Sequence, residues 1–226
     1  MKLRSVVLII LLIIIADQAL KIWIKTTFPF GHVMDVMGLR WFKLYFIENE
    51  GMAWGWKFGG EWGKLILTIF RLVAVIFGVF YIKGIVNKKY HRGFIICVAM
   101  IFAGALGNLL DSMFYGLIFS RSDDGMPLAH LFPAGGGYAG FLHGKVVDMI
   151  YAPIIENKTL PQWVPFWGGE RFTFFSPIFN IADASISTGV ITLLIFQKRF
   201  FKKHNPQEIP TTVETSSDVS DKVQVL

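Results

Sequence analysis

The sequence predicts an all-α integral membrane protein with four transmembrane helices. Three observations lead to this fold class: 54% of the 226 residues are hydrophobic, the mean hydropathy is +0.52, and the apolar residues gather in four long runs. Soluble domains contain roughly 45 to 50% apolar residues, so the chain is too apolar for that class. A run of about 20 apolar residues is long enough to cross the hydrocarbon layer as a helix.

Hydropathy sets the limits of the four runs. We expect spans at about residues 5–24, 65–82, 93–110 and 177–196. The first run follows Lys2 and Arg4, as in a secretory signal peptide, but no A-x-A cleavage site follows it. We therefore expect this run to be retained as the first helix.

Basic residues predict how the spans are oriented. They flank the start of the chain, the short connection between spans two and three, and the end of span four, at Lys2, Arg4, Lys83, Lys88, Lys89, Arg92, Lys198, Arg199, Lys202 and Lys203. Cytoplasmic loops are enriched in Lys and Arg, so we expect both termini in the cytoplasm and residues 25–64 and 112–176 outside it. This placement explains the net charge of +6 without a nucleic-acid partner.

The chain is expected to form one four-span domain over residues 1–203. From residue 204 to 226, Pro, Thr, Ser, Glu and Asp replace apolar residues, which predicts a disordered, polar cytoplasmic tail. Cys97 is the single cysteine and lies within an apolar run, so it predicts a packing role and excludes a disulfide framework.

In this topology, the polar residues of the spans gather near the outer membrane surface. The set comprises Asp17, Lys21, Arg71, Asn108, Asp111, Asn180 and Asp183. Even Arg71 would lie only about 10 Å deep, given the rise of a helix. An ionisable group at membrane depth costs at least about 2.5 to 3.5 kcal/mol, so such groups pair with one another or mark a functional site.

Local spacing leaves two interpretations open for these residues. Asp17 and Lys21 are spaced i and i+4 and can meet on one helical face as a structural ion pair. Asn180 and Asp183 are spaced i and i+3, which suits either helix capping and packing or an amide that orients a carboxylate. Asn108 and Asp111, at the end of the third span, have the same i and i+3 spacing. The convergence of several acidic positions at one depth favours chemistry.

Asp148 lies in an apolar stretch, Val146 to Ile150, that follows a glycine-rich loop. Considered alone, it fits a turn or cap residue. Near Asp183 it would complete an aspartic peptidase pair, in which an ionised carboxylate takes a proton from water and a protonated one polarises the scissile carbonyl. We therefore expect Asp148 and Asp183 to be catalytic.

Other chemistries lack the residues they require. His130 and His143 have no H-E-x-x-H motif or cysteine partner, so we expect no metal site. The chain has no G-x-S-x-G elbow, and Gly135 to Gly137 lacks the flanking residues of a P-loop. The acidic residues remain the strongest candidates.

Short motifs occur in order over residues 17–183. They are Asp17-Gln18-Ala19-Leu20-Lys21, Asn49-Glu50-Gly51-Met52-Ala53-Trp54, Ala103 to Asp111, Val146 to Ile150, and Phe179 to Asp183. This ordered set resembles the motifs of the type II signal peptidases, the bacterial lipoprotein signal peptidases. Any one of these motifs alone is weak evidence for the resemblance, whereas the ordered set is specific.

The resemblance implies both a fold and a reaction. The fold has a small β-rich extracytoplasmic cradle and a mobile loop over the site. The reaction removes signal peptides from prolipoproteins by cleavage before the diacylglyceryl-modified cysteine. Asp148 and Asp183 match the family's catalytic pair. The matching substrate-binding or supporting positions are Asp17, Lys21, Asn49, Gly51, Asn108, Asp111, Asn180 and Ala182.

The resemblance also implies the setting of the enzyme. The site would lie on the extracytoplasmic side of the bacterial cytoplasmic, or inner, membrane. The implied partners are prolipoprotein signal peptides, membrane lipids and cyclic peptide inhibitors of the globomycin type, and no metal or organic cofactor is needed. Ser112 stands where the family usually has Arg, for which Arg121 or Arg71 could substitute, and the segment from Ser112 to Lys145 is long for the family.

Two other functions account for part of the sequence. A proton- or ion-coupled transporter would use intramembrane Asp, Lys and Arg residues as a relay, but a relay needs polar residues in both leaflets. A non-catalytic membrane scaffold explains the spans but not the acidic residues. Both predict no cleavage of a lipid-modified precursor by the purified protein.

Overall fold

A computed structural model describes residues 1–49, 60–153, 155–163, 165, 168–174 and 177–201. Its helices are α1 (Leu3–Thr27), α2 (Gly60–Asn87), α3 (Arg92–Leu110), the π-helical turn η2 (Asp111–Tyr115), α4 (Gly116–Ile118) and α5 (Ile181–Phe200). Its strands are β1 (Val33–Val36), β2 (Leu39–Asn49), β3 (Val146–Tyr151), β4 (Ile155–Thr159), β5 (Arg171–Phe174) and β6 (Ile178–Phe179). Gly51 and the predicted tail lie outside the described residues.

Among the residues that the structure describes, four helical segments are long and apolar enough to cross a membrane, as the four apolar runs predict. They are Leu3–Thr27, Trp62–Asn87, Arg92–Ile118 and Ile181–Phe200. Large apolar side chains remain exposed on their outer faces: Leu8 is 57% exposed, Phe70 68% and Ile195 67%. Water would oppose this exposure, whereas lipid tails accept it.

Two boundaries differ from those that hydropathy predicts. The fourth helix begins at Ile181 rather than at residue 177, because Ile178 and Phe179 pair as β6 with β3. The third span continues past residue 110 through η2 and α4 to Ile118. A single turn of π-helix inside an α-helix is rare and is frequent at functional sites.

α3 is the central helix and packs against α1, α2 and α5. Glycines allow its close approach to α5: a Cβ at Gly104 would lie 2.2 Å from the Ala182 carbonyl oxygen, and a Cβ at Gly189 would lie 2.8 Å from that of Cys97. Cys97 is buried and free, as its packing role predicts.

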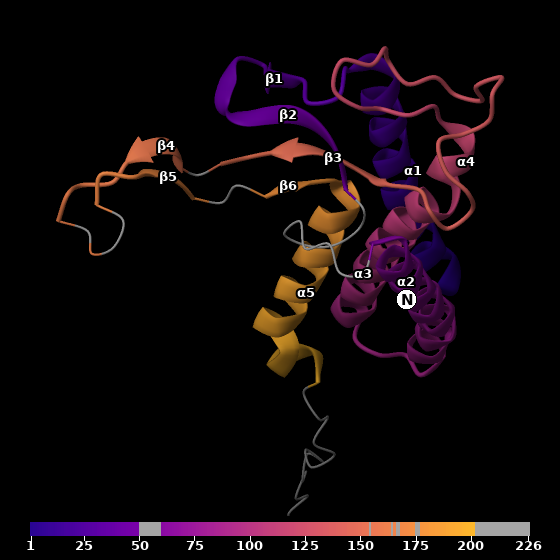
Figure 1. The fold of residues 1–226 in the computed structure, drawn as a ribbon. Helices are drawn as coiled ribbons and strands as arrows, with labels where there is room; N and C mark the ends of the chain where they lie inside the picture. The colour runs from indigo at the N-terminus through magenta and orange to yellow at the C-terminus, as the bar shows by residue number, and fades with distance from the viewer. Residues whose placement is uncertain (50–59, 154, 164, 166–167, 175–176, 202–226) are drawn as a thin grey trace, which may run out of the picture.

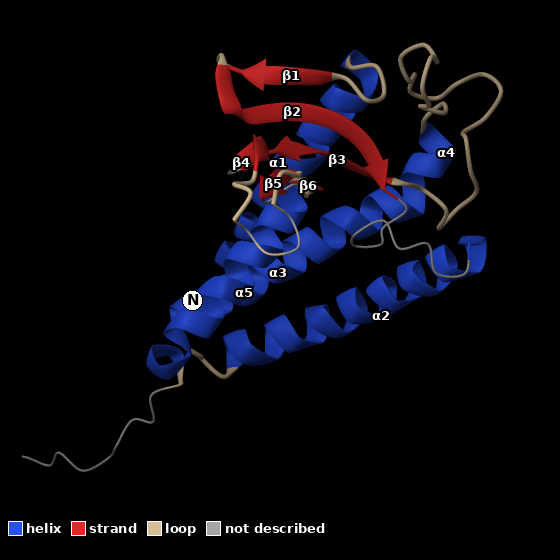
Figure 2. Cartoon of the chain, turned by 60° about the vertical axis from the view of Figure 1, so that its left-hand side comes forward, coloured by secondary structure: helices blue, strands red, loops and turns tan. Residues whose placement is uncertain are grey.

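The helices support a small antiparallel sheet at one end of the bundle (Figures 1 and 2). Its strand order is β1-β2-β3-β6, while β4 and β5 pair separately. Beneath this sheet, a buried apolar cluster joins α1, β2, β3 and the end of the third span, and it includes Ile24, Phe46, Phe119, Val147 and Met149. A second cluster around Val6, Phe94 and Ile95 fills the core of the bundle around the starts of α1 and α3. The sheet is thus anchored to the helix ends where the polar residues gather.

Candidate active site

The first turn of α5 positions Asp183. Asn180 is the N-cap of this helix, and its side-chain oxygen accepts a hydrogen bond from the Asp183 backbone N–H at 2.9 Å. The Asp183 carboxylate accepts in return from the Asn180 backbone N–H at 3.4 Å. This reciprocal capping box satisfies two backbone donors that a helix start leaves open.

Strand β3 brings Asp148 to the same place. The Asn180 amide donates to Asp148 Oδ1 at 2.7 Å, so one side chain contacts both acidic residues. Asn49, near the end of the neighbouring strand β2, donates to Asp148 Oδ2 at 3.3 Å. Asp148 is 2% exposed, so its carboxyl group lies in a largely desolvated position.

Asn108 of α3 completes the link between the two acids. Its Nδ2 donates to Asp183 Oδ1 at 2.8 Å, and its Oδ1 accepts from the Asn180 amide at 3.1 Å. The spacing of Asn180 and Asp183 is compatible with both capping and a catalytic role. In the structure the two residues form the helix cap, and the cap places the Asp183 carboxylate beside Asn108.

A buried ion cluster supports these residues from α1. Lys21 Nζ lies 2.8 Å from the carboxylates of both Asp17 and Asp111 and donates to Asn108 Oδ1 at 3.0 Å. Two acids and one lysine leave one negative charge beside the proposed pair. The predicted pairing of Asp17 with Lys21 is therefore present, extended by Asp111.

The same acids also bind backbone groups next to the proposed pair. Asp17 Oδ1 accepts from the Ala182 N–H at 2.9 Å, and Asp111 Oδ2 accepts from the Val147 N–H at 3.4 Å. Each acid thus fixes the residue that precedes Asp183 or Asp148. Ala182 is fully buried, and its small side chain leaves room for Gly107 of α3.

Gln18 and Tyr115 belong to this network, although neither was predicted to have a role at the site. The Gln18 amide donates to Asp111 Oδ1 at 2.8 Å and accepts from the Tyr115 hydroxyl at 3.1 Å. The position of Gln18 between Asp17 and Lys21 in the first motif is the signal that could have identified it. Tyr115 reaches the network from η2, a geometry that the residue pattern does not disclose.

A second buried ion pair joins α1 to the sheet. Lys25 pairs with Glu48 of β2 and donates to Ser122 Oγ at 2.8 Å. The Lys25 ammonium also lies 5.2 Å from the ring centroids of Phe119 and Tyr138, in the long segment that follows the third span. This cluster holds that segment against β2, beside Asn49.

The surroundings change the acidity of Asp148. Burial, and to a lesser extent the nearby charge of Asp183, raise the pKa of its carboxyl group to about 7. The hydrogen bonds from Asn49 and Asn180 act in the opposite direction, because they favour the ionised carboxylate. The Asp148 carboxyl group therefore keeps its proton to a higher pH than an ordinary aspartic acid does.

Basic residues considered as substitutes at Ser112 lie in different places. Arg71 of α2 is close enough to interact electrostatically with Asp183, Asp111 and Asp148. Arg121 instead pairs with Asp123 and is 65% exposed. Ser112 itself is buried and donates to the Asn108 carbonyl oxygen at 3.0 Å. Among the residues that the structure describes, no group of three or more His, Cys, Asp or Glu side chains could hold a metal ion.

Comparison with known proteins found similarities over most of the chain. Residues 9–199 match the family model described as signal peptidase (SPase) II. Proteins named lipoprotein signal peptidase match from Porphyromonas gingivalis, at 47% identity over 87% of this chain and 84% of the relative, and from Amoebophilus asiaticus, at 32% over 93% and 84%. A solved structure of a bacterial membrane enzyme has a TM-score of 0.57 and 25% identity, over 92% of this chain and 95% of the other.

Proposed function

Since the chain belongs to the signal peptidase II family, which consists of aspartic endopeptidases that process lipoproteins, we propose that Asp148 and Asp183 are its catalytic pair. The observation that supports this most directly is the shared Asn180 side chain, which hydrogen-bonds the Asp148 carboxyl group and the Asp183 backbone N–H. The supporting positions are Asp17, Lys21, Asn49, Gly51, Asn108, Asp111 and Ala182. The comparisons do not favour the transporter alternative.

In the proposed reaction, Asp148 is the protonated partner and Asp183 the ionised one. Asp183 takes a proton from a water molecule, whose oxygen attacks the scissile carbonyl carbon, while Asp148 donates its proton to the carbonyl oxygen. The tetrahedral intermediate collapses when one of its hydroxyl groups returns a proton to Asp148 and the C=O bond re-forms. The C–N bond breaks in the same step, and the leaving amine takes up the proton held by Asp183. Asn108 and Asn180 keep the two carboxyl groups in place throughout.

The proposed cleavage site on the substrate lies just before a diacylglyceryl-modified cysteine. Acyl chains of such a substrate occupy the outer leaflet, so the scissile bond lies near the membrane surface, at the level proposed for the catalytic pair. Lipid contacts on the exposed apolar helix faces fit this arrangement. Cyclic peptides of the globomycin type are expected to inhibit by occupying the same site.

The proposed location is the bacterial inner membrane, with both termini of the peptidase domain, residues 1–203, in the cytoplasm. The basic residues at the start of α1, between α2 and α3 and at the end of α5 support this orientation. It places the sheet and the catalytic pair on the extracytoplasmic side.

Substitution of each aspartate tests the pair. We expect Asp148→Asn and Asp183→Asn each to lower the cleavage rate of a lipid-modified precursor by at least about 10² to 10⁴-fold, the usual contribution of an acid or base. Purified proteins in matched detergent provide the measurement. The control is Asp124→Asn, which changes an exposed loop acid. Near-normal turnover in either test variant would remove that residue from the pair.

A further inference from the structure

The hairpin of β4 and β5 projects away from the rest of the molecule. Its strands pair antiparallel through Ile155 and Phe174 and through Thr159 and Arg171, and Leu160 continues the pairing with two backbone hydrogen bonds of 3.0 Å. The two strands pack mainly on each other, and no other described helix or strand makes extensive contact with them. A two-stranded hairpin alone in water is marginally stable, so this one needs a partner surface.

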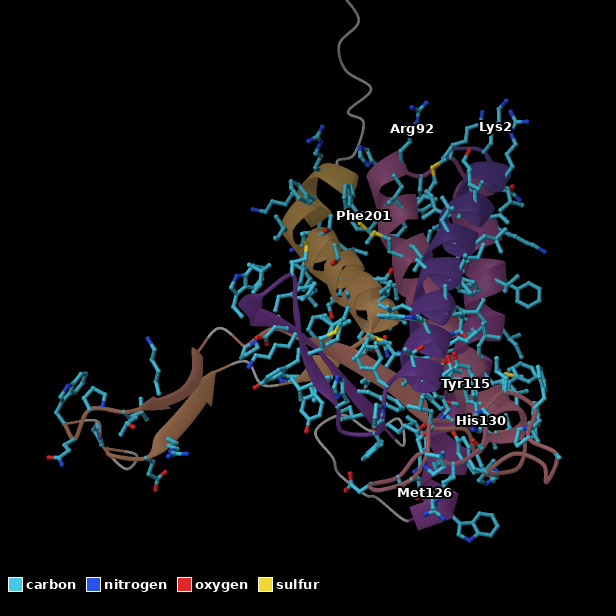
Figure 3. All side chains as sticks on the ribbon, turned by 90° about the horizontal axis from the view of Figure 1, so that it is seen from above. Lys2, Arg92, Tyr115, Met126, His130 and Phe201 are labelled. Carbon is cyan, nitrogen blue, oxygen red and sulfur yellow. The ribbon has the colours of Figure 1, made fainter. Side chains whose placement is uncertain are left out.

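The position of the hairpin identifies that surface. Figure 1 shows it extending sideways from β3 and β6, beside the start of α5. In Figure 3, Lys2, Arg92 and Phe201 mark one end of the bundle, and the hairpin reaches outward near the level of Tyr115 and His130 at the other end. Because the helices beside it cross the membrane, a segment that extends sideways at this level lies over lipid.

The composition of the hairpin suits a lipid interface rather than a charged partner. Trp163 is 81% exposed, and Trp is enriched where a membrane meets water because its ring is apolar and its N–H is polar. The charged residues of the hairpin are two acidic and two basic ones, Glu156, Lys158, Glu170 and Arg171, so their formal charge cancels. Attraction to anionic lipid would require a basic excess.

We propose that the β4–β5 hairpin binds the outer surface of the membrane, with Trp163 in the interfacial layer. This inference rests on the four membrane-crossing helices and on the proposed orientation, and it does not depend on the catalytic pair. Its consequence for the site follows from the chain path, because β4 follows β3, which carries Asp148, and β5 leads into β6 and then to Asn180 and Asp183. The hairpin is therefore connected through the chain to both acids, one on each side of it.

A fluorescent label near Trp163 tests the proposal. In a Cys97→Ala background, Gln162→Cys is labelled with an environment-sensitive dye, and the protein is reconstituted into phosphatidylcholine vesicles. Met126→Cys, on the exposed loop at the outer end of the molecule in Figure 3, is the matched control. We expect a blue shift and quenching by nitroxide-labelled lipid at 162, and quenching by aqueous acrylamide at 126.

Two further comparisons strengthen the test. Trp163→Ser in the Gln162→Cys protein is expected to reduce quenching by nitroxide-labelled lipid, because the interfacial ring is lost. Added phosphatidylglycerol should leave the depth of the label unchanged. Equal acrylamide quenching at 162 and 126 would overturn the proposal, and lipid contact that appears only with anionic lipid would overturn the role of Trp163. None of these readouts requires peptidase activity.

Discussion

Asn180 links the two proposed catalytic residues through its hydrogen bonds. It begins α5, receives the Asp183 N–H and donates to Asp148. The i and i+3 spacing predicted that Asn180 and Asp183 lie close together. It did not distinguish helix capping from a catalytic role, because both roles use the same contacts. The structure joins the two through one side chain.

The protonation of Asp148 should limit activity at high pH. The pKa of its carboxyl group is raised to about 7, so the protonated form needed to polarise the carbonyl is present below that pH and is lost as the pH rises through it. We expect the cleavage rate to fall along an alkaline limb near pH 7. Asn49→Ala removes a hydrogen bond that favours the ionised carboxylate, so the limb should move to higher pH; an unmoved limb would contradict this assignment.

The same shift has a consequence for stability. A carboxyl group with an ordinary pKa of 3.8 when unfolded and about 7 when folded binds its proton more tightly in the folded state. The stabilisation of the folded state by this tighter proton binding is therefore complete below pH 3.8 and is lost as the pH rises to about 7. In Asp148→Asn this part of the pH dependence of the thermal midpoint should disappear, whatever its effect on cleavage.

At the scale of elements, the spans were predictable and their ends were not. Hydropathy located four helices because apolar runs of sufficient length have few alternatives. Hydropathy placed the start of the fourth helix at residue 177 because Ile178 and Phe179 are as apolar as the residues of a membrane-spanning helix. Their pairing with β3 depends on residues distant in sequence, which a local pattern does not contain.

Contacts between distant elements were the least predictable part of the site. The ordered motifs selected Asp17, Lys21 and Asn108, whose contacts lie within the spans. They gave no role to Lys25, which hydropathy placed at the start of a loop, although it forms a buried pair with Glu48. The β4–β5 hairpin was also not predicted, because its strands are too short for their residue pattern to be distinguished from that of a loop.

Close packing of α3 on α5 should be essential for the site. We expect Gly104→Ala to destabilise the protein by about 1 to 3 kcal/mol, because the added methyl group meets the Ala182 backbone, and to lower cleavage by moving Asp183 away from Asn108. Thermal unfolding and turnover provide the measurements. The matched control is Gly84→Ala in α2, where a Cβ meets nothing within 4 Å. Equal effects of the two substitutions would contradict this explanation.

The buried pair between α1 and β2 should contribute more than a surface pair. Lys25→Met leaves the Glu48 carboxylate without its main partner, and we expect a loss of about 3 to 5 kcal/mol in the free energy of unfolding. Arg121→Ala, at an exposed pair, should cost only about 0 to 1 kcal/mol. The double variant Lys25→Met, Glu48→Gln should recover part of the loss in thermal unfolding. An undiminished loss in the double variant would show that packing, not the unpaired charge, dominates.

At the scale of the whole molecule, the proposed orientation has a direct test. In a Cys97→Ala background, cysteines at Lys88, between α2 and α3, and at Asp124, in the long segment before β3, are both exposed. We expect a membrane-impermeant maleimide to label Asp124→Cys in intact spheroplasts and Lys88→Cys only after permeabilisation. The reverse pattern would place the proposed catalytic pair on the cytoplasmic side.

The distribution of the site along the chain has a consequence for biogenesis. The capping box of Asn180 and Asp183 joins residues only three apart, so it forms with the first turn of α5. Asp148 reaches that turn only after the sheet has docked on the bundle. A nascent chain therefore cannot assemble the proposed catalytic pair until its fourth helix has been made and packed in the bundle, which delays peptidase activity to the last stage of membrane insertion.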